Sequence, residues 1–181
     1  MKKIPTIFKR NPGRMQEILT EPHPDCGWVF DGEGVPTRKY DGTCCRVQDG
    51  KLWKRRELKK GQAQPEGFEL ADYDGATGKT VGWMPVTEAK EDRWHIEAFG
   101  DGTLPDGTYE LCGPKVQGNP EGFEKHVLVP HSKATQYGNV PRTFEGMRDF
   151  LETMDIEGLV FHHPDGRMAK IKKRDFGRRR G

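Results

Sequence analysis

Lys39 is the residue whose setting first points to covalent chemistry. It stands two residues before Asp41-Gly42 in the stretch TRKYDGTCCR, residues 37–46. Asp-Gly is a strong turn signal and the flanking residues favour strands, so we expect Lys39 to end one strand directly before a sharp turn. An amine held there can act as a nucleophile once it loses the proton that a free lysine carries at neutral pH. The Lys-x-Asp-Gly pattern alone is weak, because it arises by chance in roughly one chain of this length in twenty.

A second group of charged candidates lies near the end of the chain. Glu157 precedes a glycine, and Lys170 and Lys172 alternate in the run AKIKK. Alternating residues of a strand share one face, so both ammonium groups would lie on the same side of a sheet. These lysines have two interpretations. The simpler one is a solvated cationic strand, and the other is a cationic face that serves the function of the protein.

The register of this last hairpin decides which side chains meet. If Asp165-Gly166 form a two-residue loop, Phe161 faces Lys170 and Leu159 faces Lys172, with the glutamate on the same face. A three-residue loop would change the register.

Strands and one helix are predicted to position these residues. The helix covers residues 143–154, with Thr143 as its N-cap. Residues 57–82 are polar and rich in glycine, and we predict a long loop or irregular segment there with short pieces of structure. A turn is predicted at Gln48-Asp49-Gly50, directly before the strand KLWKR. The predicted strands are VPTRK, TCCRV, KLWKR, WHIEAF, TYELCG, KHVLVPH, EGLVF and RMAKIKK. This arrangement predicts an α+β fold with antiparallel sheets and a few helices.

Composition supports one domain over residues 1–181. Hydrophobic residues make up 33% of the chain, with 23 Gly and 13 Pro, which disfavours a helical bundle. The sequence has no apolar run of membrane-spanning length, so we expect no membrane partner and a cytoplasmic location. The four cysteines form no Cys-x-x-Cys pair and the histidines show no zinc-like spacing, which disfavours a disulfide framework or a zinc site.

Basic residues gather at the C-terminus. Residues 170–181 contain one acidic side chain and seven basic ones: Lys170, Lys172, Lys173, Arg174, Arg178, Arg179 and Arg180. We interpret residues 174–181 as a basic tail. It suits a polyanion better than a membrane because no apolar face accompanies it. A tail that only aids solubility is the rival interpretation.

The order of the candidate motifs resembles that of the covalent lysyl nucleotidyltransferases, the superfamily of polynucleotide ligases and messenger-RNA capping enzymes. The residues that carry this resemblance are Lys39-Tyr40-Asp41-Gly42, Arg55, Glu110, Glu157, Lys170 and Lys172. The resemblance implies the antiparallel-sheet ligase adenylation fold. No C-terminal OB-type domain is recognisable.

Longer phrases resemble one branch, the ATP-dependent 5′-3′ RNA ligases of animal cells, phages and microbes, so a phage or microbial source is plausible. These phrases are KYDGTCC, LWKR, GWMPV, YELCGPKVQGNPEGFEKHVLVPH and EGLVFHHPDGRMAKI. One departure is Cys44, where the superfamily frequently has an arginine. Whether Arg46 takes over that role is open at this point.

The resemblance implies that AMP is transferred from ATP to Lys39, then to an RNA 5′-phosphate, and is finally displaced by an RNA 3′-hydroxyl. Arg38, Arg55, Lys170 and Lys172 would bind phosphates, and neighbouring cations would lower the pKa of the nucleophile. The expected catalytic set is Lys39, Glu157, Lys170 and Lys172.

The remaining ligand contacts are also implied by the resemblance. Glu110 would hold the ribose hydroxyls, and Glu157 would hold Mg²⁺ or Mn²⁺, or the nucleoside. Phe161 would cover the adenine, with Phe123 and Tyr137 as alternatives. RNA would also contact the tail through Arg174, Arg178, Arg179 and Arg180. We expect a monomer.

Two other functions stay open. A DNA ligase or a capping-type guanylyltransferase would use the same lysine chemistry, although such enzymes usually need an OB-type domain. A catalytically inactive RNA-binding module would have no need of the nucleophile.

Overall fold

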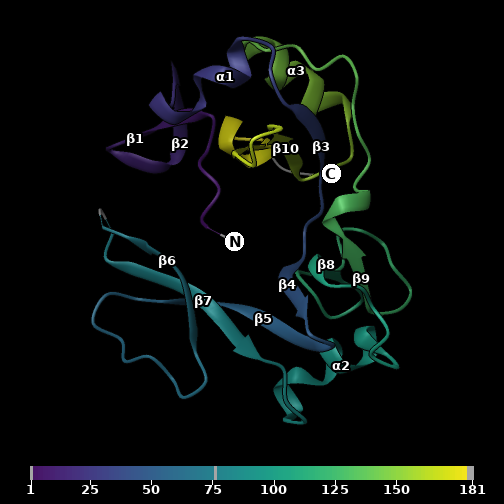
Figure 1. Ribbon diagram of the computed structural model, residues 1–181. Helices are drawn as coiled ribbons and strands as arrows, with labels where there is room; N and C mark the ends of the chain where they lie inside the picture. The colour runs from purple at the N-terminus through teal and green to yellow at the C-terminus, as the bar shows by residue number, and fades with distance from the viewer. Residues whose placement is uncertain (1, 76, 179–181) are drawn as a thin grey trace. The chain divides into compact units, whose positions relative to one another are not determined.

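The computed structural model describes residues 2–75 and 77–178, which divide into two compact units (Figure 1). The terminal unit contains Ile4–Tyr40 and the chain from Ala134 onward, and the central unit contains Asp41–Lys133 together with the residues up to Lys3. The sheets are antiparallel and open and the helices are few, so the predicted α+β class is confirmed. The arrangement is consistent with a nucleotidyltransferase-like fold.

The terminal unit is built on a three-stranded sheet in the order β11-β10-β3. A separate two-stranded ribbon, β1-β2, and several helices complete the unit. The strands are β1 (Phe8–Asn11), β2 (Arg14–Pro22), β3 (Val35–Lys39), β10 (Gly158–His162) and β11 (Met168–Lys172). The helices are η1 (Pro24–Cys26), α1 (Gly27–Phe30), α3 (Phe144–Thr153) and η4 (Lys173–Phe176), of which η1 and η4 are 3-10 helices.

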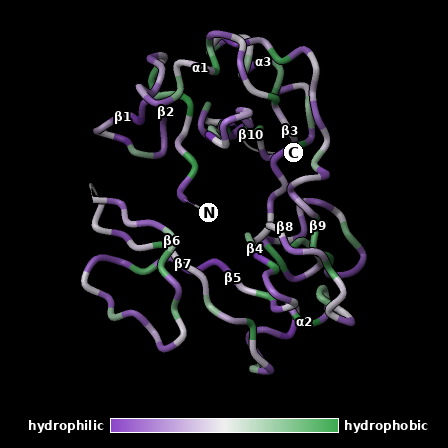
Figure 2. Tube along the Cα trace, viewed as in Figure 1, coloured by the Kyte–Doolittle hydropathy of each residue, from purple (hydrophilic) through white to green (hydrophobic). Residues whose placement is uncertain are grey.

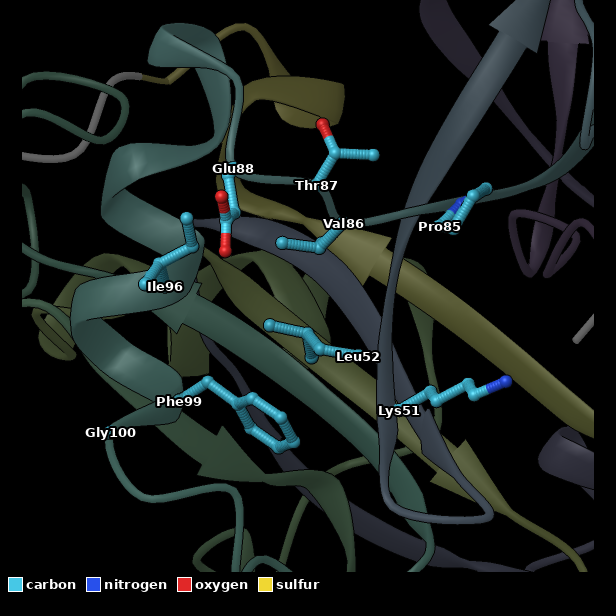
Figure 3. A pocket seen from close by; sticks show the side chains of 9 residues that line it. All are labelled: Lys51, Leu52, Pro85, Val86, Thr87, Glu88, Ile96, Phe99 and Gly100. Atoms are coloured by element: carbon cyan, nitrogen blue, oxygen red, sulfur yellow. The ribbon is translucent and has the colours of Figure 1, made fainter.

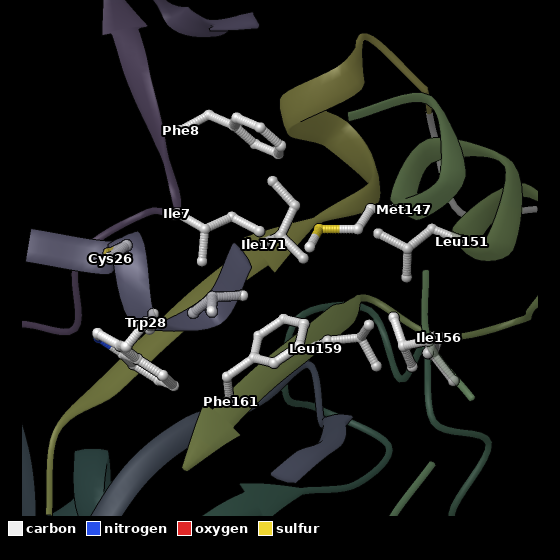
Figure 4. Close-up of a cluster of buried hydrophobic side chains, with 13 residues drawn as sticks. Ile7, Phe8, Cys26, Trp28, Met147, Leu151, Ile156, Leu159, Phe161 and Ile171 are labelled. Carbon is white, nitrogen blue, oxygen red and sulfur yellow. The ribbon is translucent and has the colours of Figure 1, made fainter. Parts of the chain in front are cut away.

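One face of this sheet forms the core of the terminal unit. Leu159, Phe161, Ala169 and Ile171 are fully buried there and pack with Met147 and other side chains of the same cluster (Figure 4). Because side chains alternate along a strand, the odd-numbered residues of β10 and β11 take the core face, and Val160, Lys170 and Lys172 take the other.

The predicted register of the β10-β11 hairpin was wrong by one residue. Phe161 pairs with Ala169, and Val160 pairs with Lys170. The amide of His163 donates to the carbonyl of Arg167 at 2.9 Å, which leaves the three-residue loop 164–166. A loop one residue longer shifts every pairing by one, so Phe161 and the lysines lie on opposite faces.

The predicted helix at residues 143–154 is confirmed as α3. The Thr143 hydroxyl accepts a hydrogen bond from the Gly146 amide at 3.1 Å, which is the expected N-cap. Met147 and Leu151 are buried on its inner face.

The central unit is a six-stranded sheet in the order β6-β7-β5-β4-β8-β9. Asp49 and Gly50, with φ angles of 52° and 69°, join two neighbouring strands of this sheet in the predicted turn. The strands are β4 (Thr43–Gln48), β5 (Lys51–Leu58), β6 (Glu69–Asp74), β7 (Lys79–Pro85), β8 (Gly107–Cys112) and β9 (Val127–Pro130). The helices are η2 (Lys90–Asp92), α2 (Arg93–Phe99) and η3 (His131–Lys133), of which η2 and η3 are 3-10 helices.

One segment prediction in this unit was wrong, and a second was only partly right. WHIEAF lies in helix α2, which ends at Gly100 with a φ angle of 61°. Ala98 and Phe99 pack against the hydrophobic core of this unit, while Ile96 is 42% exposed. The alternation of apolar and polar residues in WHIEAF therefore belongs to a short amphipathic helix. Residues 57–82 contain β6 and most of β7. β6 is an edge strand with no buried residue, so its sequence lacks the apolar pattern of a core strand and resembles a loop.

Hydrophobic residues are spread through both units in short stretches (Figure 2). In the part of the chain that the structure describes, no helix is long and apolar enough to cross a membrane.

Candidate active site

Gly158 brings Lys39 and Lys172 together. It pairs with Lys39 on one side, in β3, and with Lys172 on the other, in β11. A Cβ atom on Gly158 would lie 2.1 Å from the carbonyl oxygen of Ile171 and 2.8 Å from the Cα of Lys172. Real Cβ atoms do not approach backbone so closely, so only glycine lets these strands carry their lysines at this separation.

Glu157 bridges the two lysines. Its Oε2 accepts a short hydrogen bond from Nζ of Lys39, and its Oε1 lies 2.6 Å from Nζ of Lys172. The three side chains are only 10–19% exposed. Burial by itself would raise the pKa of Glu157, but the positive charges of Lys39 and Lys172 outweigh it and hold that pKa below its ordinary value. The carboxylate is therefore ionised at neutral pH.

Lys170 lies on the same face as this bridge. Burial, followed by repulsion from Lys172 and Lys39, lowers the pKa of Lys170 to about 8. Burial and Lys39 also lower the pKa of Lys172, although Glu157 opposes that shift. Within the described residues, Lys170 has no ion pair and no side-chain hydrogen bond. The site therefore has more positive charge than its single carboxylate compensates, which suits a ligand with several negative charges.

Arg38 and Phe161 lie apart from this cluster. Arg38 pairs with Leu159 in the sheet, so it takes the face opposite Lys39, and its guanidinium lies 4.9 Å from the ring centroid of Tyr40. Phe161 is fully buried. Neither face of the buried Phe161 ring is open to a base, so the placement predicted for it beside the lysines was wrong. Of the alternatives, Tyr137 packs edge-on against Phe150 of the terminal unit and Phe123 is half-buried in the central unit.

Glu110 belongs to the central unit, on the face of β8 opposite the core residues Tyr109 and Leu111. It pairs with Cys44 of β4 and with Val129 of β9. Its Oε2 lies 3.0 Å from Nε2 of His131, and Nδ1 of His131 lies 3.0 Å from the Thr108 hydroxyl. Glu110 is only 8% exposed.

Arg55 lies on the same face of the sheet as Glu110, since it follows Lys54, whose partner is Cys45. Its guanidinium lies 5.7 Å from the Trp83 ring centroid. Arg46 is two positions along from Cys44 on this face, and both of its terminal nitrogens donate to Glu69 at 2.7 Å. The Arg46 guanidinium also lies about 5 Å from the rings of Trp53 and Trp83. Arg46 is therefore held in the sheet by an ion pair with Glu69 and by two tryptophan rings.

The turn after Lys39 is fixed by two contacts within the central unit. A Cβ atom on Gly42 would lie 2.2 Å from the carbonyl oxygen of Leu111, so only glycine fits at position 42. The amide of Asp41 donates to Glu121 at 3.0 Å. Sequence reasoning assigned no role to Glu121 or His131, although both lie within the quoted phrase YELCGPKVQGNPEGFEKHVLVPH.

The tail predicted at residues 174–181 begins inside a packed turn. Nζ of Lys173 donates to the carbonyl of Met154 at 2.8 Å, and Asp175 is 3% exposed. Arg174 and Arg178 are exposed, and Arg178 pairs with Glu152 at 2.6 Å. Arg179 and Arg180 lie outside the described residues.

Glu157 is the residue that the sequence proposes for a metal ion. Among residues 2–75 and 77–178, no three His, Cys, Asp or Glu side chains gather in a way that could hold one. Mg²⁺, however, is commonly held by one or two carboxylates together with substrate phosphates and waters. Both oxygens of Glu157 are bound by lysines, and the excess of positive charge repels a free cation. Glu157 therefore fits that kind of shared site only together with the negative charge of substrate phosphates and after a lysine releases one of its oxygens.

A separate hollow of about 330 Å³ lies where α2 meets β5 (Figure 3). Leu52, Val86, Ile96 and Phe99 give it mainly apolar walls. None of the candidate site residues lines it.

No family model matches the chain. The chain is 24% identical to a protein named RNA ligase 1 from Danio rerio over an alignment of 262 residues. This alignment covers 97% of this chain and 80% of that protein. Proteins of the same name from Pongo abelii and Rattus norvegicus are 25% and 26% identical over 79% of this chain and 67% of their own length. The similarity to RNA ligases therefore extends over most of the chain.

Proposed function

We propose that this protein is an ATP-dependent RNA ligase that joins RNA 5′-phosphate and 3′-hydroxyl ends through AMP bound covalently to Lys39, in RNA repair. The observation that carries the proposal is the lysine cluster on one sheet face, in which Glu157 bridges Lys39 and Lys172 with Lys170 beside them. The similarity to proteins named RNA ligase 1 supports the same activity. We further propose that it acts as a cytoplasmic monomer.

In the first step, Nζ of Lys39 forms a bond to the α-phosphorus of ATP, and the bond from that phosphorus to pyrophosphate breaks. The attacking amine must be neutral, so its proton has to leave before or during the attack. Lys170 and Lys172 would hold phosphate oxygens, and the negative charge of ATP would relieve the repulsion between the lysines. Arg55 would bind phosphate and Glu110 the ribose.

In the later steps, an oxygen of the RNA 5′-phosphate takes AMP from Lys39, and a 3′-hydroxyl then displaces AMP to form the phosphodiester. Mg²⁺ or Mn²⁺, shared between Glu157 and substrate phosphates, would neutralise charge on the transferred phosphate. The nucleophile and its cationic neighbours belong to the terminal unit, and Glu110 and Arg55 to the central unit.

Incubation with Mg²⁺ and α-labelled ATP tests the first step. We expect label on the wild-type chain and none on Lys39→Ala, because the phosphoramidate needs that nitrogen. Lys51→Ala, at an exposed lysine of β5, is the matched control and should label normally. Label that persists in Lys39→Ala would contradict the proposal. Label from GTP alone would favour capping chemistry, and no label under any condition would favour an inactive binding module.

A sealing assay tests the substrate. Nicked or broken strands with a 5′-phosphate and a 3′-hydroxyl are offered as RNA and as DNA of the same sequence. We expect the RNA ends to be joined at least about tenfold faster, a difference of about 1.4 kcal/mol in activation free energy. Faster sealing of DNA would instead identify a DNA ligase.

A further inference from the structure

His131 has no role in the proposed chemistry, yet both of its ring nitrogens contact polar side chains of the candidate site. Nε2 lies 3.0 Å from Oε2 of Glu110, and Nδ1 lies 3.0 Å from the hydroxyl of Thr108. Thr108 and Glu110 are two residues apart in β8 and so share one face of the sheet. His131 follows β9, the neighbouring strand, and reaches back over both.

These contacts fix the hydrogen positions. A carboxylate can only accept, so Nε2 of His131 donates its hydrogen to Glu110. In a neutral ring Nδ1 is then an acceptor, and it takes the hydrogen of the Thr108 hydroxyl. The three side chains form one directed chain in which each hydrogen-bonding atom of His131 is used.

These hydrogen bonds give the two oxygens of Glu110 different surroundings. Oε2 is held by His131, whereas Oε1 has no hydrogen-bond partner among the residues that the structure describes. The Glu110 side chain is 10% exposed and Oε1 is not a fully buried atom, so the hydrogen-bond donor of a ligand can reach it. The donor that fits an acceptor-only oxygen is a hydroxyl or an amide.

We propose that His131 is a positioning residue that presents Oε1 of Glu110 to the 2′-hydroxyl of the nucleotide, and that the pair thereby selects ribonucleotides over 2′-deoxyribonucleotides. The inference rests on the proposed function, in which Glu110 contacts the ribose. A 2′-deoxyribose offers no hydrogen at that point, so the hydrogen bond to Oε1 would be lost and binding would weaken.

The test compares the rate of Lys39 labelling with α-labelled ATP and with α-labelled 2′-deoxyATP. His131→Phe keeps the ring and removes the donor. We expect it to slow labelling from ATP about tenfold, the scale of one hydrogen bond to a charged group, and to change labelling from 2′-deoxyATP by less than about twofold. His131→Gln keeps an N–H near the position of Nε2 and should restore most of the preference. Thr108→Val should lower it in the same direction by a smaller factor.

An equal loss with both nucleotides in His131→Phe would overturn the inference, because a residue that only supports the fold affects both alike. If thermal unfolding shows that His131→Phe does not fold, Thr108→Val decides, and an unchanged nucleotide preference there overturns it. If wild-type protein forms no lysyl-AMP, the proposed function fails by itself. Calorimetric binding of ATP and 2′-deoxyATP to wild type and Thr108→Val then tests the ribose contact without chemistry, and equal preferences reject it.

Discussion

At the scale of one residue, the ammonium group of Lys170 is unfavourable in the folded protein without a ligand. Three lysines and one glutamate share a sheet face, and Glu157 already binds the other two lysines. The lowered pKa of Lys170, about 8, measures the unfavourable interaction of its ammonium with this setting. Such a charge is kept when a bound anion uses it, which is what the proposed triphosphate substrate would do.

Replacing Lys170 by methionine should therefore stabilise the protein without ligand. The unfolded chain keeps the proton of this lysine up to about pH 10.5, whereas the folded protein loses it near pH 8. The destabilisation by Lys170 is thus complete below pH 8 and fades as the pH rises from 8 to 10.5. We expect Lys170→Met to raise the free energy of unfolding on the order of 2 kcal/mol at pH 7 and by less than half of that at pH 10.

Urea unfolding at both pH values measures this difference. Lys51→Met is the matched control at an exposed lysine, and its effect should be small and similar at both pH values. A gain for Lys170→Met that is equal at pH 7 and pH 10 would show that packing rather than charge is responsible.

At the scale of elements, the site depends on the separation of three strands. Gly158→Ala would place a Cβ atom 2.1 Å from the Ile171 carbonyl oxygen, so β10 and β11 would have to move apart. We expect a loss of roughly 2–4 kcal/mol in unfolding free energy, together with slower labelling of Lys39, since backbone clashes and core displacement add. Gly138→Ala is the control in the same unit, because nothing lies within 4 Å of its added Cβ. Equal stability of the two variants in thermal unfolding would contradict this explanation.

The elements that sequence predicts well are those with a strong local signal. The turn at Asp49-Gly50, the Thr143 cap and the strands beside Lys39 depend on neighbouring residues, and the structure has each of them. The hairpin register depends on whether the loop begins at residue 164 or at residue 165, and composition cannot distinguish the two. WHIEAF is too short for its period to distinguish a strand from a helix, and the core contacts of Phe99 decide the outcome.

The candidate site was predictable in its motif residues and not in its supporting ones. Glu157, Lys170 and Lys172 were expected to share a face, and the structure places them there together with Lys39 although the predicted register was wrong. Arg38 was expected to bind phosphate and to lower the pKa of the nucleophile, yet it takes the opposite face from Lys39 because neighbours in a strand point to opposite faces. Residues such as His131 act through long-range contacts that have no local pattern.

At the scale of the whole molecule, RNA binding should depend on salt. Each phosphate contact made by a lysine or arginine releases counterions, with a slope of about −0.7 per contact for single strands. Deleting residues 178–181 removes three arginines, so we expect the slope of log affinity against log salt to flatten by up to about 2. Binding of 5′-phosphorylated RNA across a salt series measures it.

The control for this deletion removes the same charge elsewhere. Replacing Lys9, Arg14 and Arg148 by glutamine removes three cations that each pair with a carboxylate on the surface. We expect a smaller change in slope than for the deletion. An unchanged slope in the deletion variant would leave residues 178–181 as a tail that aids only solubility.

The order of the two units along the chain determines which sheet can form first during protein synthesis. All six strands of the larger sheet lie between residues 43 and 130, so that sheet can assemble while the ribosome is still adding the rest. β3 leaves the ribosome before any of them, but its partner β10 is made only at residues 158–162. The strand that carries the nucleophile thus waits through the synthesis of more than a hundred residues for its neighbour. Lys39 and Glu157 can meet only after residue 157 has been synthesised, so a chain released before that point would lack the proposed catalytic cluster.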